Sequence, residues 1–233
     1  MPRIRIKTIA GVPILYDRDP PENYGRTGYP VEPWIDSDFS IQAEKMFSQL
    51  FLALQSSGFG SVTHLLYGGI GRVGGGKPSY HHDNRAFDLD ALRFSNNRVW
   101  VATSFPPYPH LYLAIESVVR QHFGTVLGYG YNAAHRDHIH FDNGEPPGFN
   151  RMAKSRVMFL QRALHYMFDE SLAIDGVYGP QTRQVETRVR KLLGLETLTT
   201  RANWISFLGT AGGIALDRAT ASAEAGAAGA TVA

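Results

Sequence analysis

Two short stretches of this chain are dense in histidine and aspartate. The first, residues 79–88, reads SYHHDNRAFD, and the second, residues 135–140, reads HRDHIH. Imidazole and carboxylate groups are common ligands of zinc in proteins, and three such ligands with one open position are typical of a catalytic site. The two stretches lie far apart in the chain, so the fold must bring them together if they bind one metal ion.

The spacing within each stretch suits strands that present ligands on one face. Side chains alternate between the two faces of a strand, so Asp88 would lie opposite the face that carries its apolar neighbours, and His138 and His140 would share a face. If the two strands pair, Asp88 and His140 become neighbours, and His81 can fold back from the preceding loop to complete a third corner. Two imidazoles and one carboxylate then leave a position for water, whose pKa a bound zinc ion lowers to about 7.

The composition restricts the kind of metal site and the partners. The chain contains no cysteine, which excludes disulfides and thiolate zinc sites such as zinc fingers. It has 23 basic and 21 acidic residues and a formal net charge of +2, so nucleic acid is not an expected partner. No segment approaches the roughly 20 consecutive apolar residues that span a bilayer, and we expect no stable membrane insertion.

The periodicity of the hydrophobic residues predicts an α+β fold. A small antiparallel sheet is expected to carry the metal ligands, with helices at its flanks. The expected strands are 4–16, 62–67, 86–92, 98–103, 126–127 and 139–141, and the expected helices beside them are 38–56 and 109–123.

Pro146, Pro147 and Gly148 mark a boundary in the chain. Residues 1–148 are predicted to form a catalytic domain and residues 149–200 a small helical domain. Residues 201–233 are predicted to form a flexible tail, because the end of the chain is rich in alanine, glycine, threonine and serine.

The first stretch resembles a known signature. Ser79-x-His81-x-x-Asn84-x-Ala86-x-Asp88 is similar to the Ser-x-His-x-x-Gly-x-Ala-x-Asp pattern of zinc D-Ala-D-Ala metallopeptidases, whose relatives include murein endopeptidases and proteins of the hedgehog-type fold. Asparagine stands where glycine is usual, but asparagine tolerates a left-handed backbone, so the turn can form.

The second stretch resembles the extensin-like C-terminal branch of that group. The resemblance runs from Phe123-Gly124-Thr125 through Tyr131 to His140, and with the first stretch it covers about residues 60–143. The cysteines that are common in this branch are missing. The resemblance implies a fold like that of the D-Ala-D-Ala peptidases, with Zn²⁺ as the cofactor and His81, Asp88 and His140 as its ligands.

The resemblance leaves two residues for the general base. Asp137 is the acid three residues before the last ligand, and His138 is the first histidine of the His-x-His pair. We expect both within the site, with Asp137 as base and His138 orienting groups or stabilising the oxyanion. Either residue can instead fix the tautomer of a ligand imidazole. His135 is expected to line the site, and Arg72 and Lys77 are candidate anchors for a substrate carboxylate or solvated loop charges.

Residues 153–194 resemble a peptidoglycan-binding domain of the three-helix type. The residues that carry the resemblance are VMFLQRAL at 157–164 and LAIDGVYGPQTR at 172–183. In the second segment two turns bracket a short apolar stretch, and Pro180 suits the first turn of a helix. Carbohydrate contacts are expected around Tyr178 and Arg183.

Together the two resemblances predict a zinc-dependent peptidase that hydrolyses an amide bond in the stem or cross-link peptides of peptidoglycan. Carboxypeptidase and endopeptidase action both stay open. The helical domain would hold the enzyme on the polymer and raise its effective concentration there.

The N-terminus has no apolar run of signal-peptide length. Action on the bacterial cell wall, in the periplasm or outside the cell, would then need delivery through a holin-type pore, as for a phage lysin, or by a secretion machine. An alternative class is a cell-wall-binding protein with an inert or structural metal site. A metal-dependent nuclease is a third, which the near-neutral charge disfavours.

Overall fold

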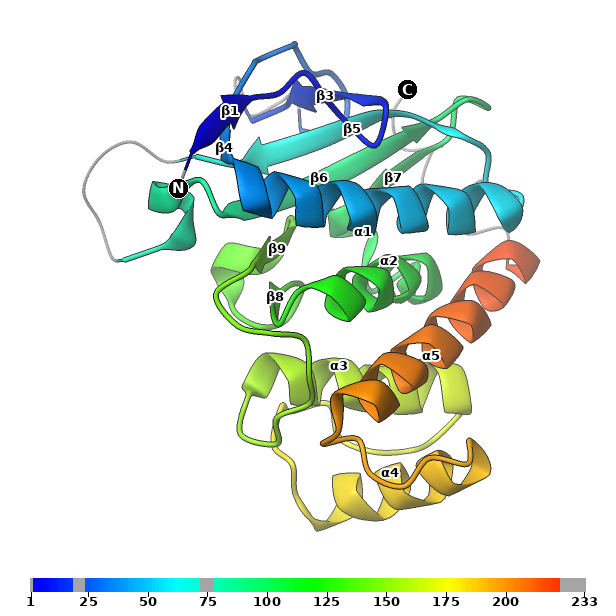
Figure 1. The fold of residues 1–233 in the computed structure, drawn as a ribbon. Coiled ribbons are helices and arrows are strands. Elements are labelled where there is room, and N and C mark those ends of the chain that lie inside the picture. The colour runs from blue at the N-terminus through cyan, green and yellow to red at the C-terminus, as the bar shows by residue number, and fades with distance from the viewer. Residues whose placement is uncertain (1, 19–23, 72–77, 223–233) are drawn as a thin grey trace.

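The computed structural model describes residues 2–18, 24–71 and 78–222 and has a mixed α+β architecture (Figure 1). The strands are β1 (Arg3–Arg5), β2 (Thr8–Ile9), β3 (Val12–Tyr16), β4 (Trp34–Asp36), β5 (Val62–Gly69), β6 (Ala86–Phe94), β7 (Val99–Val101), β8 (Thr125–Leu127) and β9 (Ile139–Asp142). The α-helices are α1 (Ser37–Ser56), α2 (Pro109–His122), α3 (Lys154–Phe168), α4 (Pro180–Leu192) and α5 (Arg201–Ala221). Short 3₁₀ helices are η2 (Tyr80–Asp83), η3 (Ala102–Ser104) and η4 (Ala133–His135).

The main sheet has the strand order β2-β3-β5-β6-β9-β8, and β7 pairs with β6. The pairs that involve β6 and β9 are antiparallel, as predicted. The pair β3–β5 is parallel, so the prediction of a purely antiparallel sheet is wrong there. A parallel pair needs a crossover connection, and α1 lies in the connection between these two strands. β1 and β4 form a separate two-stranded sheet.

The strands that carry the predicted ligands are anchored in the core. Phe87 and Leu89 flank Asp88, Ile139 and Phe141 flank His140, and all four apolar side chains are fully buried. The rings of Phe87 and Phe141 stack with their centroids 5.3 Å apart. Each such side chain stabilises the fold by about 1.5–3 kcal/mol on burial, so the ligands between them stand on a rigid support.

Helix α1 packs on one face of the sheet, with α2 beneath it (Figure 1). Its N-terminus is capped by Asp36, whose Oδ1 accepts from the Phe39 amide at 3.0 Å. Phe47 extends from its buried face toward the sheet, and its ring centroid lies 5.5 Å from that of Phe87.

Gln161 of α3 fixes the turns that precede α4. Its amide donates to Asp175 Oδ1 at 2.9 Å, to the Val177 carbonyl at 3.1 Å and to Thr182 Oγ1 at 3.1 Å. Its carbonyl oxygen accepts from the amide of Gly176 at 2.8 Å. A single buried side chain therefore holds the segment that carries the second resemblance.

Three buried arginines join α2, α3 and the segment between them. Each guanidinium donates hydrogen bonds to the protein backbone, which compensates for the loss of water around its charge. Arg120 donates to Val126 O and Ser155 O, Arg156 to Gly124 O and Gly148 O, and Arg162 to Tyr129 O.

The prediction of a flexible tail from residue 201 onward is wrong as far as residue 222, because residues 201–221 form α5. Trp204, Phe207 and Leu208 are buried on this helix, and its small residues permit close contact with α2. A Cβ atom added to Gly212 would lie 2.2 Å from Ser117 Oγ of α2. The alanine and glycine residues that suggested a flexible tail instead allow α5 to pack closely against α2. Only α3 and α4 come from residues 149–200, and α5, a further helix that packs with α3, comes from the predicted tail.

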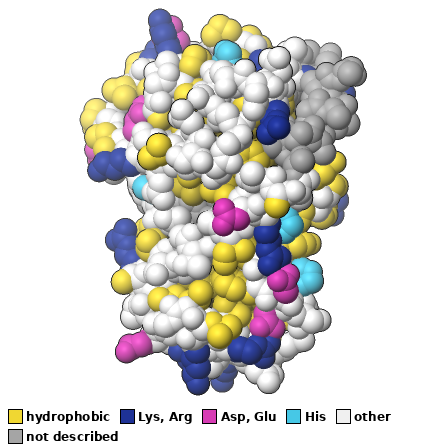
Figure 2. All heavy atoms as spheres, turned by 90° about the vertical axis from the view of Figure 1, so that its right-hand side faces the viewer, with side chains coloured by type: hydrophobic (Ala, Val, Ile, Leu, Met, Phe, Trp, Pro, Cys, Tyr) yellow, Lys and Arg dark blue, Asp and Glu magenta, His cyan; other side chains and the backbone are white. Residues whose placement is uncertain are grey.

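On the face shown in Figure 2, basic and acidic side chains lie among one another and form no surface of a single sign. This arrangement agrees with the balanced composition. Among the described residues, no helix combines the length and apolar character needed to cross a membrane.

Candidate metal centre

The register of β6 and β9 places Asp88 directly opposite His140, which confirms the pairing predicted from strand alternation. His81 comes from η2, where Ser79 Oγ accepts from the His81 amide at 3.3 Å. Asn84 ends this turn with φ of 59° in the left-handed region, as predicted for the residue that replaces glycine. The turn therefore directs the chain from His81 into the strand that bears Asp88.

The donor atoms of His81, Asp88 and His140 converge and can hold a metal ion. His140 Nδ1 lies 3.0 Å from Asp88 Oδ1 and 3.2 Å from His81 Nε2, and His81 Nε2 lies 3.3 Å from Asp88 Oδ1. Ligands about 2.0 Å from a tetrahedral zinc ion stand about 3.3 Å from each other. The side chains are 10–17% exposed, so the centre is shielded and still reachable from solvent.

Hydrogen bonds outside the triad fix the tautomers of both imidazoles. In its neutral form His140 donates from Nε2 to Asp142 Oδ2 at 3.2 Å, and His81 donates from Nδ1 to the Ile70 carbonyl at 3.3 Å. Each ring then turns a lone pair toward the other ring and toward Asp88. Two lone pairs 3.2 Å apart repel each other unless a metal ion or a proton lies between them, and with both rings neutral the donor set fits a divalent metal.

The carboxylates around His140 set its protonation. Burial opposes the charged imidazole, but the hydrogen bonds with Asp142 and Asp88 outweigh it and raise the pKa of His140 to about 9. Burial likewise opposes ionisation of Asp88, whereas its bonds with His140 and His81 hold its pKa well below the usual range. A metal ion must therefore displace a proton from His140 when it binds.

Replacing Asp142 with asparagine should weaken metal binding about 10- to 100-fold, since groups that orient a ligand histidine contribute that much. Titration against a chromogenic chelator measures the affinity. Asp83→Asn is the matched control, because Asp83 is exposed on the same turn as His81. Equal affinities in the Asp142→Asn variant and the unaltered protein would contradict this role of Asp142.

Asp137 and His138 lie beside the triad. Asp137 is in the loop before β9, and its Oδ1 accepts from His138 Nδ1 at 2.8 Å. Its Oδ2 accepts from Arg18 Nη1 at 2.8 Å. The bond with His138 and the Arg18 guanidinium lower the pKa of Asp137 to about 2. The other nitrogen of His138, Nε2, lies 3.5 Å from Asp88 Oδ1 and so faces the metal position.

His135 lies at the edge of the same group of rings. Its centroid is 5.1 Å from that of His138 and 5.8 Å from that of His140. Its Nδ1 pairs with Asn132 Oδ1 at 2.7 Å. Burial and the neighbouring histidines lower the pKa of His135 to about 4, so its ring is neutral at pH 7. Arg72 and Lys77, the predicted substrate anchors, lie outside the described residues.

The sequence patterns did not identify Arg18, which lies just after β3 and forms a bidentate pair with Asp90. The only available signal was Asp90, which lies two residues after Asp88 on the same strand and therefore shares its face. Gly68 leaves room for this pair, since a Cβ atom there would stand 2.6 Å from Arg18 Nε and 2.8 Å from Asp90 Oδ2.

One family model matches the chain. Its description is extensin-like protein C-terminus, and the match covers residues 30–152. That segment contains the three residues of the triad as well as Asp137 and His138. No curated protein and no solved structure matches the chain. Because the family match spans more than half of the sequence, the chain belongs to the extensin-like protein C-terminus family.

Proposed function

We propose that this protein is a zinc-dependent peptidase that hydrolyses an amide bond in peptidoglycan peptides. The observation that carries the proposal is the convergence of His81, Asp88 and His140 with both imidazole tautomers fixed for metal binding. The Asp137–His138 pair at the edge of the triad supports it, because hydrolysis needs a group that moves protons beside the metal. The resemblance of the first stretch to peptidases supplies the substrate class.

Zinc bound at the triad would lower the pKa of a water molecule and polarise the substrate carbonyl. The residues beside it would handle the protons. Both oxygens of Asp137 are engaged, one by His138 and one by Arg18, whereas His138 Nε2 faces Asp88. We therefore propose that His138 accepts the proton of the attacking water at Nε2. Asp137 would orient the His138 ring and stabilise its charged form. This division of labour reverses the expectation drawn from the motif.

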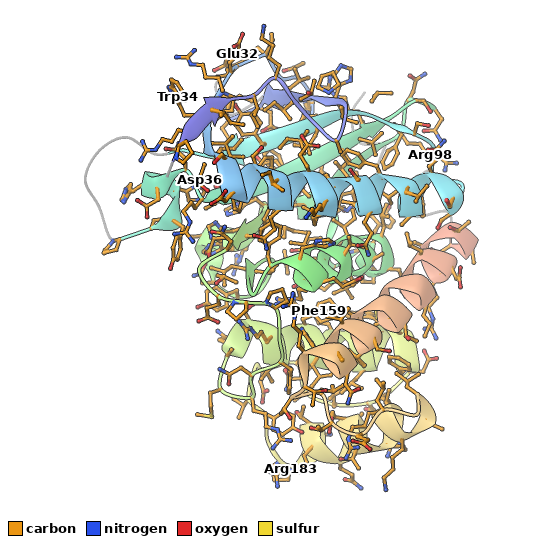
Figure 3. The ribbon with its side chains drawn as sticks, in the orientation of Figure 1. Glu32, Trp34, Asp36, Arg98, Phe159 and Arg183 are labelled. Atoms are coloured by element: carbon orange, nitrogen blue, oxygen red, sulfur yellow. The ribbon has the colours of Figure 1, made fainter. Side chains whose placement is uncertain are left out.

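The proposed role of the helical part is attachment to the wall. Tyr178 and Arg183 line a surface depression of about 400 Å³, together with Pro180 and Thr187. The Arg151 guanidinium lies 5.0 Å from the centre of the Tyr178 ring. Figure 3 shows Arg183 at the lower end of the molecule, away from the sheet. An aromatic ring beside polar groups suits a saccharide, so we place glycan contacts here.

Purified sacculi provide the test of the proposed function. The zinc-loaded protein should release soluble stem or cross-link peptides, which mass spectrometry identifies, and a chelator should stop the release until zinc is restored. The fragment masses distinguish carboxypeptidase from endopeptidase action. Binding to sacculi without any released peptide would refute the peptidase and favour a wall-binding protein with an inert metal site.

A further inference from the structure

Arg18 connects two carboxylates that belong to different parts of the site. Its Nη2 donates to Asp90 Oδ1 at 2.7 Å, its Nε donates to the other oxygen of Asp90, and its Nη1 donates to Asp137 Oδ2 at 2.8 Å. Asp90 is fully buried on β6, whereas Asp137 is in the loop before β9. The guanidinium therefore ties the loop before β9 to strand β6 of the main sheet.

We propose that Arg18 is a positioning residue that acts on His138 through Asp137, and its Nη2 itself lies 3.3 Å from His138 Nδ1. It holds the Asp137 carboxylate at the angle that keeps His138 Nε2 facing the metal centre. This inference rests on the proposed hydrolase activity and adds to it a residue that precedes the family match, which begins at residue 30.

The contacts around Arg18 suit this task. A planar guanidinium can bind one carboxylate with two donors and still offer a third, which a lysine ammonium cannot match in a fixed geometry. The guanidinium carbon lies 5.1 Å from the centre of the Tyr24 ring, and the Tyr24 hydroxyl donates to the backbone carbonyl of Asp137. The loop is thus held at its side chain and at its backbone by two neighbouring groups.

The alternative is that Arg18 merely compensates the charge of buried Asp90. That role predicts lower stability without a specific effect on turnover. A double-mutant cycle separates the two, because residues that act through one another are not additive. If Arg18 acts through Asp137, its removal has little further effect once Asp137 no longer orients His138.

The experiment compares Arg18→Ala, Arg18→Lys, Asp137→Asn and the double variant Arg18→Ala/Asp137→Asn, all zinc-loaded, on the soluble muropeptide that the sacculus experiment identifies as a substrate. Arg18→Ala and Arg18→Lys should lower kcat about 10- to 100-fold, as loss of orienting groups does, with KM and zinc affinity unchanged. In the double variant, kcat should stay within about twofold of Asp137→Asn. Free guanidinium should restore part of the activity of Arg18→Ala. Exposed Arg26, mutated to alanine, is the control and should behave as the unaltered protein.

A second readout does not depend on activity. Nitrogen-15 NMR of the histidine rings should show His138 protonated at Nδ1 in the unaltered zinc protein, and Arg18→Lys, which keeps a positive charge beside Asp90, should change that signal. If the unaltered protein cleaves no peptide but the signal changes, the proposed function fails and the link from Arg18 to His138 stands. Unchanged kcat in both Arg18 variants, additive losses in the double variant, or an unchanged signal would overturn the inference.

Discussion

His140→Ala is expected to abolish stoichiometric zinc binding and to slow peptide release from sacculi by about a thousandfold or more. The substitution removes one of three donors, and a metal acting as a Lewis acid contributes several kcal/mol to the transition state, where each 1.36 kcal/mol is about tenfold in rate. His81→Ala and Asp88→Asn should act in the same direction. Metal analysis of the purified variants and mass spectrometry of the soluble fraction measure the two effects.

His64→Ala is the matched control for this series. His64 lies on β5, in the same sheet, and its Nδ1 pairs with the neighbouring Thr63 hydroxyl at 3.3 Å. This variant should keep its zinc and its rate. Full activity in a His140→Ala protein that no longer holds zinc would show that the triad has no part in catalysis.

Arg120→Ala is expected to lower the free energy of unfolding by about 3–5 kcal/mol, the usual cost of leaving a buried partner charge uncompensated. Arg120 donates to Glu116 Oε1 from Nε at 2.9 Å and from Nη2 at 2.7 Å, and to the Ser155 carbonyl at 3.0 Å. Both charged side chains are almost fully buried. The Arg120 guanidinium carbon lies 5.1 Å from the centre of the ring of Phe159 on α3. Figure 3 shows Phe159 in the interior of the molecule.

Urea denaturation followed by circular dichroism measures the loss. The double variant Glu116→Leu/Arg120→Met is the control, because exchanging a whole buried ion pair for apolar residues of similar volume has a smaller effect than breaking it. It still loses the bonds to Val126 and Ser155, so we expect it between Arg120→Ala and the unaltered protein. A loss below about 1 kcal/mol in Arg120→Ala would contradict the assigned importance of the pair.

The triad could be predicted because the resemblance pointed to its three residues and local rules set the faces of their side chains. Alternation along each strand put Asp88 and His140 on the face opposite their apolar neighbours. The tolerance of asparagine for a left-handed backbone allowed Asn84 to close the turn after His81. The pairing of β6 with β9 then required only that two strands with buried neighbours lie side by side. Periodicity also located α1 and α2 within a residue or two of their observed bounds.

Residues whose positions depend on tertiary structure could not be predicted in this way. Arg18 reaches Asp90 and Asp137 only because β3 pairs in parallel with β5, and no short sequence pattern encodes that pairing. Helix α5 was missed because alanine and glycine are typical of both flexible segments and closely packed helices. Its partner, Ser117 on α2, lies far away in the sequence.

The three arginines that join α2, α3 and their connecting segment also limit how this protein can diversify. A recombination event that exchanged residues after 149 for an unrelated helical segment would remove Arg156 and Arg162, and with them the donors to the carbonyl groups of Gly124, Tyr129 and Gly148. A buried carbonyl left in that state, as at Gly124, destabilises the fold by about 1–3 kcal/mol, and the half-buried residues Tyr129 and Gly148 add to the loss. Substitutions at the surface around Tyr178 should therefore be tolerated better than exchange of the whole helical part.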